Sequence, residues 1–161
     1  MSAGSRDKVI HLLESFHERA QKIALLQYEL INFQQASPGE VISGMGLGHS
    51  CEMTPCSGYV SNKTLFIALN YQERVEQINA ESLNSILAEL GEVSCVQNRL
   101  EYYVSILCPR QKTVIRRFYF EGCSWEEVAM EVNVALRTVH KIKGRAFDKL
   151  AEFYDFSRAY Q

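Results

Sequence analysis

The sequence is poor in proline and contains no long apolar run. Only three prolines occur in 161 residues, which favours long helices because proline removes a backbone hydrogen-bond donor. No stretch is apolar enough to span a membrane, and the polar residues 1–7 do not resemble a signal peptide. With 47% apolar and 22% charged residues, these features predict an ordinary globular protein of the cytoplasm.

Motifs of catalysis and of cofactor binding are also missing. The sequence has no glycine-rich phosphate-binding motif, no nucleophile elbow and no recognisable pair of catalytic carboxylates. We therefore expect neither enzymatic activity nor a cofactor. Five cysteines, an odd number, indicate free thiols in a reducing compartment. His49, Cys51 and Cys56 are the candidate metal ligands, but their spacing matches no common zinc pattern, so no metal site is predicted.

Apolar spacing predicts an all-α chain with two regions. Residues 1–108 contain two long helical patterns, over 5–33 and 64–107, with apolar positions every three or four residues, close to a heptad repeat. Between them, residues 34–61 hold five glycines and two prolines and predict a long loop, either a flexible link or a segment that orders on a partner. The expected fold is a long N-terminal helical hairpin or coiled coil, followed by a C-terminal helix-turn-helix unit over 109–161.

Charge is distributed unevenly along a chain whose formal net charge is only −2. Residues 109–161 hold ten Lys/Arg and seven Asp/Glu, whereas residues 1–108 are net acidic. Within residues 135–149 five basic residues occur with a single acidic one, Asp148. Because phosphate binding depends on local charge, this excess predicts contact with nucleic acid.

Residues 124–153 have the pattern of two helices joined by a tight turn. Ser124 and Glu127 have the spacing of a capping box, and Asn133 tolerates the left-handed conformation that often ends a helix. The second helix is predicted to begin near Leu136. Its buried face is predicted to consist of Val139, Ile142, Ala146, Leu150 and Phe153. The opposite face is basic, as in a helix that enters a DNA major groove.

The segments 109–129, 133–139 and 144–150 resemble region 4 of the sigma-70 class, and within it the sigma-like phage regulators of late transcription, the ArpU type. The resemblance implies a sequence-specific transcription regulator of phage or prophage origin that binds double-stranded DNA, with RNA polymerase as a candidate partner. It implies base contacts at the start of the second helix, by Leu136, Arg137, His140 and Lys141. Thr138 and Arg145 are further candidate DNA contacts, Arg145 to a phosphate. Ala135 replaces the usual Ser or Thr cap, so a side-chain cap bond is expected to be absent there.

The sequence also favours a quaternary structure and leaves two alternative functions open. The apolar stripe over 64–107 is longer than a helix over 5–33 can cover, which favours a homodimer. A phage packaging protein of the small-terminase kind also joins a helix-turn-helix to oligomerising helices, but it typically places the DNA-binding unit first. A helical adaptor that binds only RNA polymerase is the other alternative, and the basic second helix counts against it.

Overall fold

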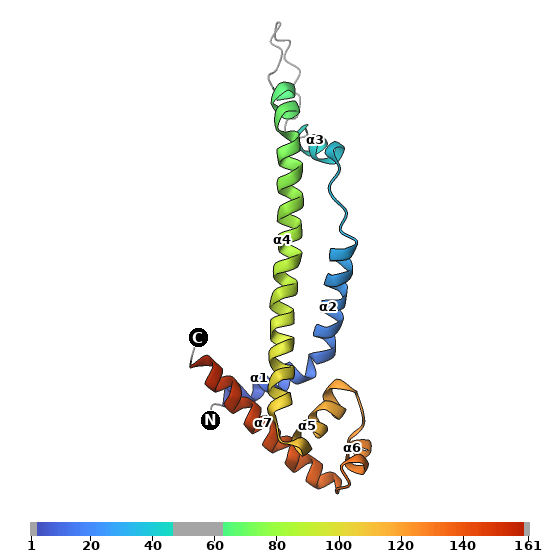
Figure 1. Cartoon of the computed structure of the whole chain (residues 1–161), viewed down its shortest axis with the longest axis vertical. Helices are drawn as coiled ribbons and strands as arrows, with labels where there is room; N and C mark the ends of the chain where they lie inside the picture. Colours follow the sequence, from blue (N-terminus) through green and yellow to red (C-terminus); the bar gives the residue numbers. More distant parts are fainter. Residues whose placement is uncertain (1–2, 47–62, 160–161) are drawn as a thin grey trace. The chain divides into compact units, whose positions relative to one another are not determined.

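The computed structural model describes residues 3–46 and 63–159, and all regular elements in these ranges are helical (Figure 1). They are α1 (Ala3–Glu14), α2 (Phe16–Ile31), α3 (Pro38–Gly46), α4 (Lys63–Ile106), α5 (Pro109–Ile115), the π-helix η1 (Arg116–Phe120), α6 (Trp125–Glu131) and α7 (Leu136–Arg158). The predicted all-α fold, with a long helix followed by a C-terminal helical unit, is confirmed. Within the described ranges, the helices are too short or too polar to cross a membrane.

The chain forms two compact units, which we describe separately. The first unit holds residues 1–25 and 91–161, and the second unit holds residues 26–90. The first unit therefore extends beyond the predicted region 109–161. It also contains the N-terminal helix α1 and the C-terminal part of α4.

The main core of the first unit combines both ends of the chain. It is formed by Val9, Leu13, Leu100, Val104, Leu107, Ile115, Tyr119, Ala146, Phe147, Leu150 and Ala151. Within this unit α1 packs against α7 (Figure 1). The predicted inner stripe of α7 is confirmed at Val139, Ala146 and Leu150, which are fully buried. The packing of α1 on α7 was not predicted, because apolar spacing identifies a buried face and not its neighbour.

The predicted single helix over residues 5–33 is interrupted at Ser15, between α1 and α2. The Ser15 hydroxyl donates a hydrogen bond to the carbonyl four residues earlier at 2.6 Å, and the Arg19 guanidinium donates to the carbonyl of Leu12. Such bonds from a side chain back to a helix carbonyl bend helices. Arg19 Nε also donates to Oε1 of the buried Gln97 at 3.1 Å. Arg19 thus links the bend to a residue of α4 that is remote in sequence.

The predicted loop over residues 34–61 is wrong where α3 forms. The backbone N–H of Ser37 donates to Glu40 Oε2 at 2.9 Å, and the N–H of Glu40 donates to Ser37 Oγ at 3.3 Å. This reciprocal pair is a capping box, and Pro38 follows it at the first helical position, where its missing N–H has little cost. The candidate metal ligands of this loop lie outside the described residues: His49, Cys51 and Cys56.

The hydroxyl of Tyr154 is buried in the first unit and has no hydrogen-bond partner among the described residues. Burial raises the pKa of Tyr154 to about 12. Because this folded-state pKa lies above the ordinary value of about 10, the neutral side chain contributes stability below pH 10 that is lost as the pH rises towards 12.

We expect Tyr154→Phe to remove this part of the alkaline loss of stability. At neutral pH the variant should be as stable as the wild type or more so, since an unpaired buried hydroxyl is removed. Urea unfolding of both proteins at neutral pH and at about pH 11 measures the difference. An identical alkaline loss in the two proteins would show that Tyr154 does not contribute to it.

Candidate nucleic-acid interface

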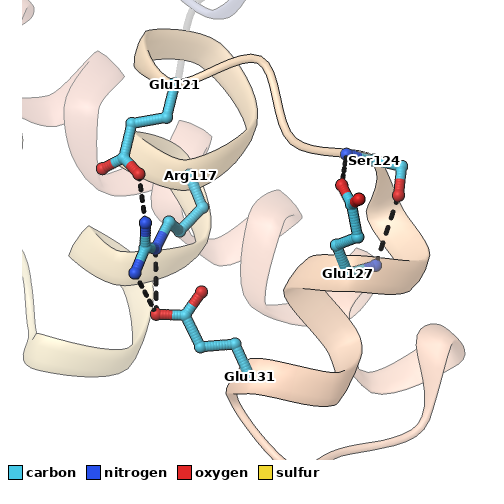
Figure 2. A network of polar contacts seen from close by, with 5 residues as sticks. All are labelled: Arg117, Glu121, Ser124, Glu127 and Glu131. Carbon is cyan, nitrogen blue, oxygen red and sulfur yellow. Dashed lines mark hydrogen bonds and ion pairs between the residues drawn. The ribbon is translucent and has the colours of Figure 1, made fainter.

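Helix α6 begins with a reciprocal cap, which Figure 2 shows. Ser124 Oγ accepts a hydrogen bond from the N–H of Glu127 at 3.3 Å, and Glu127 Oε2 accepts one from the N–H of Ser124 at 2.7 Å. The hydrogen bond from the backbone N–H of Ser124 lowers the pKa of the Glu127 carboxyl group. The two bonds of the cap satisfy two N–H groups that a helix start leaves without partners. The predicted capping box is confirmed.

The same helix ends in a left-handed turn at Asn133, whose φ is 53°. The N–H of Asn133 donates to the carbonyl of Met130 at 3.1 Å, and the N–H of Val134 donates to the carbonyl of Ala129 at 3.0 Å. These two bonds form a Schellman motif with asparagine at the left-handed position. The predicted helix end is confirmed, and the turn sets the direction in which α7 leaves α6.

We expect Asn133→Ala to lower the free energy of unfolding by about 1–2 kcal/mol, because alanine tolerates the left-handed conformation poorly. Asn133→Gly is the matched control and should leave stability nearly unchanged, since glycine adopts this conformation without strain. Thermal or urea unfolding of the three proteins provides the comparison. Equal stability of the alanine and glycine variants would rule out a backbone requirement at this turn.

Arg117 fastens the π-helix η1 to the last turn of α6 (Figure 2). Its Nε and Nη2 atoms donate to Glu131 Oε1 at 2.9 and 2.7 Å, and Nη1 pairs with Glu121. Hydrogen bonds from Glu131, then from Glu121, raise the pKa of Arg117. This guanidinium is therefore engaged by two carboxylates of the protein. Within the first unit these contacts link η1 to α6.

A second, smaller core holds the helix-turn-helix together from inside. Val114 of α5, Val128 of α6 and Val139 of α7 are fully buried in it. At its edge Trp125 stacks on Phe118, with ring centroids 3.5 Å apart and planes 14° apart. Lys143 Nζ of α7 lies 4.7 Å from the Trp125 ring centroid, within the range of a cation–π interaction. These contacts fix the inner side of α7, so its first turns present their other sides outward.

The six residues predicted to contact DNA are all exposed, and they gather around the first turns of α7. They are Leu136, Arg137, Thr138, His140, Lys141 and Arg145. Among them His140 also approaches the Trp125 ring, at 5.3 Å between centroids. The helix start at Leu136 and the missing side-chain cap at Ala135 are both confirmed. Whether these six side chains touch DNA stays a prediction.

Sequence reasoning missed a further basic residue beside this helix. Arg6 of α1 forms an ion pair with Asp148 of α7, with 3.3 Å between Nη1 and Oδ1. The same guanidinium lies beside Gly144, since a Cβ built there would be 3.9 Å from Arg6 Nη2. No local pattern in the sequence pairs these residues, because they come together only through the packing of α1 on α7.

Comparison with known proteins identifies the region to which this geometry belongs. No curated protein and no solved structure matches the chain. Residues 104–152 match the family model described as sigma-70, region 4. The matched residues run from the last turn of α4 through α5, η1 and α6 into α7. The resemblance of this segment to sigma-70 region 4, a helix-turn-helix DNA-binding region, is therefore confirmed.

Proposed function

We propose that the chain is a sequence-specific, sigma-like transcription regulator that acts by binding DNA rather than by catalysis. The observation that carries the proposal is the coincidence of the sigma-70 region 4 match with the exposed basic start of α7. The resemblance to ArpU-type regulators supports a phage or prophage origin. A regulator of this kind works on DNA in the cytoplasm.

In the proposed complex the first turns of α7 enter the major groove. Residues at the N-terminal end of a recognition helix contact base edges. We expect Arg137 to donate two hydrogen bonds to O6 and N7 of a guanine, and Leu136 to contact a thymine methyl group. Thr138, His140 and Lys141 lie on the same exposed turns and supply further hydrogen-bond donors. We expect Arg145, further along the helix, to contact a phosphate.

The second unit supports the proposal of a homodimer. Among its residues with described side chains, only Leu26 and Val41 are buried apolar side chains. Ile31 and Leu69 are 83% and 72% exposed. A unit of this length needs a larger apolar core to be stable, so we propose that a second copy of the chain covers these side chains. Two copies also suit the paired half-sites at which helix-turn-helix dimers bind.

Oligomer size separates the regulator from the packaging alternative. A regulator of the proposed kind should be a dimer by sedimentation equilibrium, whereas a small-terminase-like protein would form a ring of about eight or more subunits. The position of the matched region in the C-terminal half of the chain favours the regulator, because packaging proteins typically place this unit first. RNA polymerase is proposed as a second partner, on the strength of the resemblance to sigma region 4.

Selection of bound duplexes from a random pool tests the proposed function. The full chain is expected to enrich a defined sequence motif and to bind it more tightly than unrelated duplexes of equal length. Typical helix-turn-helix proteins prefer their specific site by a factor of about 10³ or more. Enrichment of no motif, with equal affinity for all duplexes, would refute sequence-specific recognition. An adaptor that binds only polymerase would retain no duplex at all.

A further inference from the structure

We propose that Arg6 of α1 is a DNA phosphate contact, so that the N-terminal helix extends the interface beyond the region matched to sigma-70 region 4. The inference rests on the proposed DNA binding by α7. Arg6 lies outside residues 104–152, and α1 has no counterpart in the matched segment. Both helices belong to the first unit, in which α1 packs on α7.

Arg6 lies beside the face of α7 that carries Arg137 and Lys141. Arg137, Lys141, Gly144 and Asp148 succeed one another at steps of four, three and four residues, which puts them on one face of the helix. Gly144 contributes no side chain to this face. The guanidinium of Arg6 lies at this position, with Nη2 beside Gly144. Arg6 thus supplies from α1 the positive charge that α7 itself lacks there.

The position along α7 fits a phosphate rather than a base. Gly144 is seven residues after Arg137, which is about 10 Å along the helix axis. The major groove is about 8.5 Å deep. When α7 points into the groove with its N-terminal end first and Arg137 reaches the base edges, a cation about 10 Å further along the helix axis lies near the phosphates at the groove edge. Arginine suits this role because its guanidinium has five N–H donors.

The ion pair with Asp148 orients Arg6 but leaves much of the Arg6 side chain exposed. The pair joins Nη1 to Oδ1 at 3.3 Å, and the side chains of Arg6 and Asp148 are 47% and 42% exposed. Helix α1 is held instead mainly by the buried side chains of Val9 and Leu13, and by a hydrogen bond that Ser5 Oγ donates to Asp155. A phosphate can therefore approach Nη2 while α1 stays in place.

Because Arg6 and Asp148 carry opposite charges, replacing each in turn distinguishes a phosphate contact from an ion pair with only a structural role. Arg6→Ala and Asp148→Asn remove the same ion pair, so a structural role changes DNA affinity in the same direction in both variants. A phosphate contact by Arg6 instead predicts opposite changes. Arg6→Ala weakens binding because a cation is lost, and Asp148→Asn strengthens it because a carboxylate near the phosphates is neutralised.

The measurement is the affinity of the full chain for its selected duplex and for an unrelated duplex at several salt concentrations. Arg6→Ala should weaken binding to both duplexes by about five- to tenfold near 0.1 M salt, and reduce the slope of log K against log salt by about one. Arg6→Lys should retain most of the slope. Lys8→Ala is the matched control, because residues 6 and 8 lie about 200° apart around α1, and it should change neither quantity.

Three outcomes decide the inference. Opposite effects of Arg6→Ala and Asp148→Asn, with the slope reduced only in the first, support the contact. Parallel effects, or a slope unchanged in Arg6→Ala, overturn the contact while the proposed function stands, provided that the wild type binds and Arg145→Ala reduces its slope. Absence of binding by the wild-type chain to either duplex overturns the inference together with the proposed function.

Discussion

Replacement of Leu13 by alanine is expected to lower the free energy of unfolding of the first unit by about 2–5 kcal/mol. Leu13 lies in α1, far from the matched segment in sequence, yet it is 1% exposed and shares one core with Leu100 and Leu150. Truncation removes apolar contacts and leaves a cavity that the surrounding helices fill only in part. Urea unfolding followed by circular dichroism measures the loss.

Leu136→Ala is the matched control for this experiment. It makes the same chemical change in the first turn of α7, where Leu136 is 40% exposed. Its effect on stability should stay within about 0.5 kcal/mol, as for most exposed positions. If Leu13→Ala proves no more destabilising than Leu136→Ala, α1 is not an integral part of the unit that carries the helix-turn-helix.

Arg137→Ala is expected to weaken specific DNA binding by about 1–3 kcal/mol and to relax the preference at one base position. Arg137 is exposed at the second residue of α7, where recognition helices contact base edges. The loss should appear on the selected duplex and shrink on a duplex substituted at the contacted base. Fluorescence anisotropy titrations on both duplexes measure the difference.

Comparison with Arg145→Ala distinguishes an arginine that reads a base from one that contacts a phosphate. Arg145 is also exposed on α7, so the two variants remove the same type of side chain from the same helix. A phosphate contact predicts weaker binding to every duplex and a salt slope reduced by about one. An equal loss of selectivity in both variants would mean that the assignment of reading and phosphate-contacting residues is wrong.

Local signals in the sequence predicted the helix-turn-helix in detail. The capping box of Ser124 and Glu127, the left-handed Asn133 and the start of the second helix at Leu136 were all confirmed. Each depends on residues within one or two turns of one another, where hydrogen bonding and steric preference act directly. The exposure of the predicted DNA-contacting residues follows from the same periodicity, because the inner face of α7 was correctly assigned.

Features that depend on distant residues could not be predicted in the same way. The apolar spacing of Val9 and Leu13 indicates a buried face but not that α7 covers it. The bend at Ser15 involves Arg19 and its bond to Gln97, which only the folded chain brings together. Helix α3 is a different case, because the capping box of Ser37 and Glu40 is a local signal that the surrounding glycines obscured.

The first turns of α7 are proposed to occupy a DNA major groove. Guanine N7 lies in that groove and is methylated by dimethyl sulfate when it is accessible. On the selected duplex the full chain should protect guanines of the motif. Arg137→Ala, at a concentration that restores full occupancy, should leave one of these guanines reactive. Tight binding by the wild type without protection at N7, or protection identical in the variant, would contradict the claim.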